Sequence, residues 1–171
     1  KGLDKVTHIN EELMEMVVLR ETGRACGMAA AHQGVEEPPG SGVFLPDETM
    51  GNVSKLNVCN AFWRVMALAG DIGGGLLVTP PSLKELKNPE IKDYVEEFYS
   101  FGSDEPTENI LKVHKHLQNW TAGLHGVGTW HGAGPVMAQK IMLQRVTDYS
   151  REKDLVRKTL NLKESPDKEN L

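Results

Sequence analysis

The sequence contains no apolar run near the roughly 18 residues that a membrane-spanning helix needs, and residues 1–10 are too polar for a signal peptide. Its two cysteines, Cys26 and Cys59, lie far apart and outside any Cys-x-x-Cys spacing, so they are expected to be buried thiols. The 19 basic residues are scattered among 24 acidic ones, with a net charge of −5. These absences predict a cytoplasmic protein with no membrane or nucleic-acid partner.

Common catalytic and metal-binding motifs are missing as well. His114 and His116 are two positions apart on a predicted helix, so they face different sides and are expected to be solvated. His125 and His131 flank a glycine-rich corner, but two imidazoles without a carboxylate or thiolate make a poor metal site. No metal site is expected, and no Ser-His-Asp or Cys-His set can be assigned, so a self-sufficient enzyme is the least favoured hypothesis.

Apolar residues recur at steps of three and four along most of the chain, which predicts an all-α fold, an up-and-down bundle of long antiparallel helices. No segment alternates with period two for long enough to predict a strand, and 43–46 is too short to assign. The 171 residues suggest one helical domain, 1–162, and a polar tail, 163–171. Start and stop signals place helices at 3–32, 47–72, 89–101, within 110–127, from 135 onward and at 150–162, with an extended connector at 76–81 and a corner at 126–134.

Two glycine-rich segments resemble nucleotide-binding loops only superficially. Gly126-Val127-Gly128 opens like a dinucleotide fingerprint, but His131 replaces the third glycine and a helix precedes it. Gly70–Gly75 lacks the Lys-Ser/Thr of a phosphate loop, and it is expected to end the second helix with room for close packing. Its bare backbone also suits close approach of another chain's cofactor, with Lys55 and Asn57 as phosphate contacts; a solvated Lys55 is the simpler alternative.

The segment Thr129-Trp130-His131-Gly132-Ala133-Gly134-Pro135 combines an aromatic ring, an imidazole, two glycines and a helix-opening proline. Free N–H groups and the positive end of a helix dipole would favour an anionic or flavin-like ligand there. A plain helix-helix corner is the alternative that chemistry alone favours.

Several blocks, in order, resemble one family, that of 4-hydroxyphenylacetate 3-hydroxylase and 4-hydroxybutyryl-CoA dehydratase (vinylacetyl-CoA isomerase). The resemblance spans about residues 3–160 and depends on the ordered set rather than on any single block. The blocks are Ala25-Cys26-Gly27-Met28-Ala29, Asn52 to Val58, Asp71 to Ser82, Lys87-Asn88-Pro89-Glu90, His131-Gly132-Ala133-Gly134 and Ala138 to Met142.

This resemblance implies a C-terminal helical bundle similar to that of acyl-CoA dehydrogenases, which mediates tetramer formation and binds FAD partly against a neighbouring subunit. It implies that His131 is the candidate catalytic residue and faces the substrate side together with Gly132. The flavin phosphates or adenine would lie near Lys55, Asn57, Asp71, Gly73, Gly74 and Gly75, and Gly132 is a further candidate contact of the cofactor.

The departures from the family pattern limit what can be transferred. The family's N-terminal and middle domains have no counterpart here, and no iron-sulfur ligands of the dehydratase match this chain. Gly128 stands where the dehydratase has a glutamate, so an acid/base group is missing. We therefore expect a fragment or small subunit that contributes to FAD binding and works as a homo-oligomer or with a separate catalytic subunit. The alternative is a helical oligomerisation module without activity.

Overall fold

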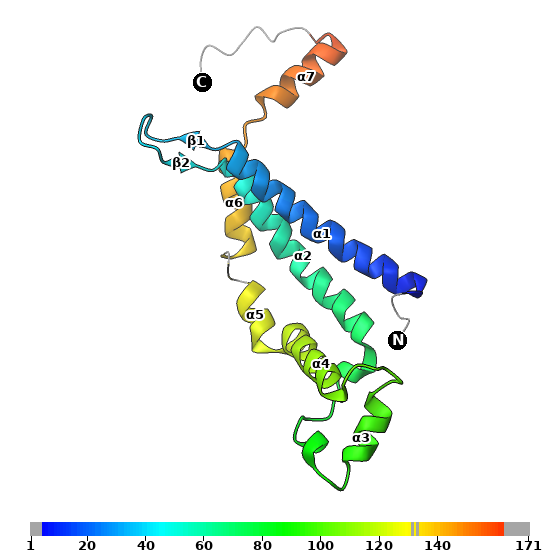
Figure 1. Ribbon diagram of the computed structural model, residues 1–171. Coiled ribbons are helices and arrows are strands. Elements are labelled where there is room, and N and C mark those ends of the chain that lie inside the picture. The colour runs from blue at the N-terminus through cyan, green and yellow to red at the C-terminus, as the bar shows by residue number, and fades with distance from the viewer. Residues whose placement is uncertain (1–4, 131, 133, 163–171) are drawn as a thin grey trace.

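Two long antiparallel helices form the spine of an elongated molecule (Figure 1). They are α1 (Thr7–His32) and α2 (Glu48–Gly73), in a computed structural model that describes residues 5–130, 132 and 134–162. The predicted all-α class is confirmed. The predicted tail, 163–171, lies outside the described residues.

Local signals explain both ends of the second helix. The side chain of Asp47 accepts a hydrogen bond from the backbone N–H of Met50 at 2.7 Å, which confirms it as the N-cap. At the other end Gly74 takes a positive φ of 56°, and its N–H donates to the carbonyl oxygens of Gly70 and Asp71. The predicted range 47–72 is therefore correct to within one residue.

Small residues let α1 and α2 approach closely. A side chain at Gly23 would lie 3.0 Å from Cγ2 of Val58, so a larger residue there would push the helices apart. The hydroxyl of Ser54 donates to the carbonyl oxygen of Gly23 at 2.9 Å and ties the helices together at this point. A bidentate pair of Arg64 with Glu15, at 2.5 and 2.7 Å, links the same helices nearer the other end.

A short two-stranded ladder connects the spine helices. Strands β1 (Val35–Glu36) and β2 (Phe44–Leu45) are antiparallel, with Val35 opposite Leu45. No strand is predicted here, because two residues are too few for an alternating pattern to be recognised.

The opposite end of the spine carries α3 (Lys92–Tyr99) and α4 (Thr107–Ala122). The prediction that α3 starts at Pro89 is wrong, because Asn88 holds this proline in a turn: its side chain accepts from the N–H of Glu90 at 3.1 Å. The expected extended connector 76–81 is also corrected. Residues Gly74–Leu77 form a 3-10 turn, η2, whose Leu77 is buried, and the amide of Gln118 donates to the Leu77 carbonyl at 2.8 Å.

A helix break that was not predicted lies at Gly123, between α4 and α5 (Leu124–Trp130). The predicted corner 126–134 is shorter than expected, because α5 extends to Trp130 before the chain turns into α6. Gly123 is extended, with φ −97° and ψ 172°. Gly126 and Gly128 are accommodated inside α5, which the low helix propensity of glycine did not suggest.

The last two helices differ in their surroundings. Helix α6 (Val136–Val146) packs against α2, whereas α7 (Ser150–Leu160) projects from the end of the spine that carries the strands (Figure 1). Among the described residues, the buried apolar side chains are Ile9, Ala30, Cys59, Leu68, Leu77, Val95 and Leu111. Within the same residues no helix is long and apolar enough to cross a membrane.

Candidate functional site

The glycine-rich turn between α5 and α6 is held against the middle of α2. Gly132 donates its N–H to the carbonyl oxygen of Thr129 at 3.1 Å, and Gly134 takes φ 88°, a conformation that favours glycine. Pro135, the predicted first residue of α6, is its N-cap, so the helix begins one residue later, at Val136. The proposed catalytic residue, His131, lies outside the described residues, so its role stays a prediction.

A buried amide anchors this turn. The side chain of Gln139 is 4% exposed, and its Nε2 donates both to the carbonyl oxygen of Gly134 at 3.0 Å and to Sγ of Cys59 at 3.2 Å. One side chain therefore joins the turn, α6 and α2. Sequence reasoning missed this role because a glutamine on a helix is usually solvated, and the pattern did not show that position 139 faces inward.

The predicted phosphate contacts on α2 do not form one cluster. Lys55 is exposed and Asn57 is half-buried. Residues two apart on a helix face different sides, so one small anion cannot contact both. Lys55 lies one helical turn before Cys59, the residue of α2 that Gln139 contacts. Lys55 therefore lies on the same side of α2 as Cys59, whereas Asn57 faces a different side.

The second predicted cofactor segment lies farther along the same helix. Asp71 to Gly75 are about 14 residues beyond Cys59, roughly 20 Å at 1.5 Å per residue. A side chain at Gly73 would overlap the buried Leu77, whereas Gly74 and Gly75 have no neighbouring atom within 4 Å of an added Cβ. Because this is a helix C-terminus, it presents carbonyl oxygens and the negative end of the dipole. It therefore suits a hydrogen-bond donor, such as an amino or hydroxyl group, better than a phosphate.

Trp120 of α4 lines several adjoining pockets. His116 and His125 both contact its ring edge to face, with ring centroids 6.1 and 5.2 Å apart. Trp120, with these two histidines, lines a pocket of about 450 Å³, and Leu124 and His125 continue into one of about 320 Å³ beside Gly128. The sequence did not reveal this set, because only the helix break at Gly123 brings His125 back onto Trp120.

The prediction of solvated histidines is half right. His116 is exposed, but His114 is half-buried and packs against Phe101, with ring centroids 6.3 Å apart. Nδ1 of His114 is buried and has no hydrogen-bond partner among the described residues. In this part of the chain no group of three His, Cys, Asp or Glu side chains is placed to hold a metal ion.

An apolar groove runs along the spine on the side of Trp120. Its two sections, of about 590 and 410 Å³, share Leu13, Met16, Val65, Met66 and Trp120. Its apolar lining suits a hydrophobic partner surface or a planar apolar ring.

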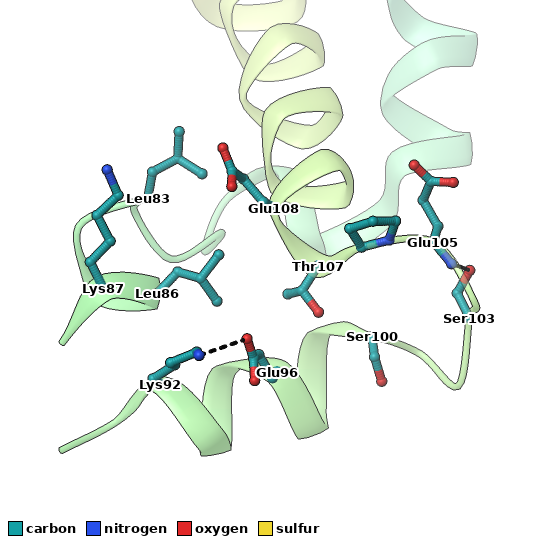
Figure 2. Close-up of a pocket in the computed structure, with 11 residues that line it drawn as sticks. Leu83, Leu86, Lys87, Lys92, Glu96, Ser100, Ser103, Glu105, Thr107 and Glu108 are labelled. Carbon is teal, nitrogen blue, oxygen red and sulfur yellow. Dashed lines mark hydrogen bonds and ion pairs between the residues drawn. The ribbon is translucent and has the colours of Figure 1, made fainter. Parts of the chain in front are cut away.

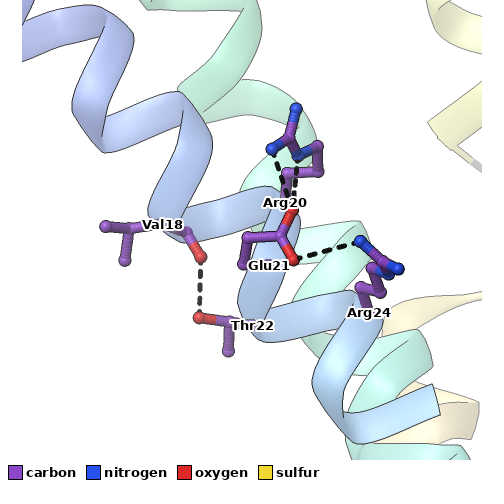
Figure 3. Close-up of polar contacts among 5 residues, drawn as sticks. All are labelled: Val18, Arg20, Glu21, Thr22 and Arg24. Carbon is purple, nitrogen blue, oxygen red and sulfur yellow. Dashed lines mark hydrogen bonds and ion pairs between the residues drawn. The ribbon is translucent and has the colours of Figure 1, made fainter. Parts of the chain in front are cut away.

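Charged side chains border this groove. Arg20 and Arg24 line one section of it, and both pair with Glu21, at 2.8 and 3.6 Å (Figure 3). The guanidinium of Arg64 holds the pKa of the Glu15 carboxyl below its usual value through a hydrogen bond. Because these groups are exposed, they set the charge around the groove rather than the stability of the fold.

A separate pocket of about 580 Å³ lies between α3, the 3-10 turn η3 (Glu85–Lys87) and the start of α4 (Figure 2). Its wall carries both charges: Lys92 pairs with Glu96 at 3.6 Å, and Glu108 has a pKa lowered by its hydrogen bond to Lys112. The mixed wall gives no preference for a ligand of one charge.

The geometry can be compared with known proteins. The family described as 4-hydroxyphenylacetate 3-hydroxylase C terminal matches residues 1–161. The chain belongs to this family. It is 32% identical over 174 residues to the 4-hydroxybutyryl-CoA dehydratase/vinylacetyl-CoA-Delta-isomerase of Clostridium aminobutyricum, an alignment that covers 95% of this chain and 35% of that protein.

Solved structures show the same relationship. The oxygen tolerant archaeal 4-hydroxybutyryl-CoA dehydratase of N. maritimus is 33% identical, with a TM-score of 0.85 over 98% of this chain and 34% of that one. The oxygenase component of 4-hydroxyphenylacetate 3-monooxygenase, complexed with FAD and 4-hydroxyphenylacetate, is 21% identical and has a TM-score of 0.82, over 94% of this chain and 34% of that one; it shares the fold. This member of the 4-hydroxyphenylacetate 3-hydroxylase C-terminal family therefore spans about a third of the length of these relatives.

Two glycines of α5 provide a matched test of this part of the family fold. A Cβ on Gly126 would overlap the backbone oxygen of Trp120, so Gly126→Ala is expected to lower the free energy of unfolding by about 1–3 kcal/mol. Gly128 has no atom within 4 Å of an added Cβ, and Gly128→Ala should raise it by up to about 1 kcal/mol through helix propensity. Urea unfolding of both variants measures the difference, and equal effects would contradict the assigned close contact.

Proposed function

We propose that this domain serves as the C-terminal helical part of a flavin-dependent assembly, where it contributes to FAD binding and to subunit association. It acts as a fragment of a longer protein or as a small subunit beside a separately encoded catalytic chain. Its family membership supports this proposal, since members of the family have been crystallised with FAD.

The observation that carries the proposal is the unusually large exposed surface. The accessible surface is 12972 Å², whereas a compact monomer of 171 residues is expected to expose roughly 8300 Å². Large apolar side chains along both spine helices remain uncovered and contribute to this surface. Their exposed fractions are 58% for Met14, 62% for Val18, 62% for Met28, 56% for Val58 and 47% for Trp63. Soluble monomers rarely expose so much apolar surface, so association with other protein surfaces is expected.

The flavin half of the proposal assigns roles to the sequence-predicted residues. Lys55 would contact a flavin phosphate as a point charge, and His131 with Gly132 would form part of the wall on the substrate side. The bare backbone at Gly74 and Gly75 would accept donors from the adenine or ribose. FAD supplies the redox chemistry, and the protein supplies position and electrostatics.

Flavin binding to the purified chain is the direct test. We expect FAD fluorescence and sedimented mass to change together when FAD is added to the chain alone or mixed with its catalytic partner. Lys55→Ala should weaken binding about 5- to 30-fold, the value of one charge-assisted contact of about 1–2 kcal/mol. Lys112→Ala is the control, because Lys112 is an exposed lysine that pairs with Glu108 on α4 and is not among the predicted flavin contacts. Absence of flavin binding together with absence of association in both samples would refute the proposal.

The second candidate is an oligomerisation module that binds no flavin. The apolar lining of the groove and the carbonyl-presenting end of α2 favour it, since neither feature attracts phosphate. Under this alternative Lys55→Ala and His131→Ala would leave assembly unchanged and FAD would not bind to any form. Under the flavin proposal Lys55→Ala alters FAD binding while assembly is retained.

A further inference from the structure

No residue that the structure describes covers helix α7. Every residue from 148 to 162 is exposed, and the helix projects beyond the strand end of the spine (Figure 1). The exposed fractions are 65% for Leu155, 51% for Val156 and 63% for Leu160. Helical spacing gathers these three residues into one stripe.

Such a short helix needs a partner surface. Isolated helices under about 12–15 residues are marginal in water, and α7 has 11. Local capping provides part of the stability: Asp148 accepts from the backbone N–H and the hydroxyl of Ser150 at 2.9 and 2.7 Å, and Asn161 ends the helix in the left-handed conformation. The apolar stripe is then the remaining source of stabilisation, and it requires a surface to cover it.

The opposite end of the molecule carries a complementary surface. On α3, Tyr94 and Phe98 are 63% and 66% exposed and one helical turn apart. Asp93 and Glu97 flank them, and residues 84–108 contain eight acidic residues and three lysines. Helix α7 has four basic and two acidic residues, with Arg151 and Lys158 beside its stripe. An aromatic, acidic face thus matches an aliphatic, basic one.

We propose that α7 of one copy docks on α3 of a second copy, across a two-fold axis that places the two long molecules antiparallel. The two ends are far apart in one chain (Figure 1), so α7 cannot reach its own α3. A two-fold axis forms the contact twice, which compensates for the small area of one helix pair. This inference rests on the assembly role proposed above and names its surfaces.

Charge also argues against docking of α7 in the spine groove. Arg20 and Arg24 line that groove, so the basic helix α7 would meet side chains of its own charge there. The acidic end around α3 offers the opposite charge, and opposite charges across an interface select the partner and its orientation.

Charge reversal with exchange tests the pairing. One variant carries Arg151→Glu and Lys158→Glu, and the other carries Asp93→Lys and Glu97→Lys. Each alone should associate at least tenfold more weakly than the unaltered chain, measured by light scattering and sedimentation. An equimolar mixture should regain the mass of the unaltered chain, because both contacts in the mixed pair join opposite charges. The control, Lys140→Glu with Arg145→Glu on α6, has the same net charge change as the α7 variant and should leave the mass unaltered.

The result that overturns the inference is equally specific. If both reversed variants keep the mass of the unaltered chain, or if their mixture regains none of it, α7 and α3 do not pair. A monomeric unaltered chain at about 100 µM would also overturn it. Flavin binding or association that persists through such a result would leave the proposed function standing, so the two failures are distinguishable.

Discussion

Leu111→Ala is expected to lower the free energy of unfolding by about 2–5 kcal/mol, the usual cost of removing a fully buried leucine side chain. Leu111 is 0% exposed and lies on α4, which packs against α2, α3 and the 3-10 turn η2. Few large apolar side chains are fully buried in the described residues, so each one carries a large share of the cohesion. The substitution should therefore loosen the whole end of the molecule that holds Trp120.

Urea unfolding at a concentration where the chain is monomeric gives the measurement. Val113 is the matched control, because it lies on the same helix and is 58% exposed. Val113→Ala should change the free energy of unfolding by no more than about 0.5 kcal/mol. If the two substitutions cost the same, Leu111 does not lie in a packed core.

Much of the fold could be predicted because apolar residues recur at steps of three and four along long helices. The predicted bounds of the second helix agree with α2 to within one residue, because Asp47 is a residue type that caps a first turn and its carboxylate does so here. Errors occurred where tertiary contacts override local preference. Gly126 suggests a helix end, yet it lies inside α5. The close approach of the Trp120 backbone explains why the residue there is a glycine.

The candidate site was less predictable for a related reason. A glycine shows where the backbone carries no side chain, but not whether a ligand or the protein itself occupies the space beside it. The side chain of Leu77 occupies the space beside Gly73, whereas the space beside Gly74 and Gly75 is open. The inward direction of Gln139 depends on how α6 meets α2, which no single segment encodes. The roles of His131, Gly132 and Lys55 stay predictions.

Gln139→Glu is expected to destabilise the domain strongly at neutral pH. The replacement has nearly the same shape, but an ionised carboxylate cannot donate to the Gly134 carbonyl or to Cys59, which the amide contacts at 3.0 and 3.2 Å. Burial should raise the pKa of the new carboxyl by about 2–3 units above the unfolded value of about 4.3. Because the raised pKa lies close to 7, the linkage is not complete at that pH, and the loss at pH 7 is about 2–3 kcal/mol relative to pH 4.

The sign of the pH dependence separates this mechanism from simple loss of packing. With the folded pKa raised, the folded state binds more protons than the unfolded state between the two pKa values, so stability falls as pH rises through that window. The comparison is the difference from the unaltered chain in urea unfolding between pH 4 and 7. Gln139→Leu should cost about 1–3 kcal/mol for the lost hydrogen bonds at every pH. A pH-independent Gln139→Glu would mean that position 139 is open to water, and the turn at Gly132 would then lack its buried anchor.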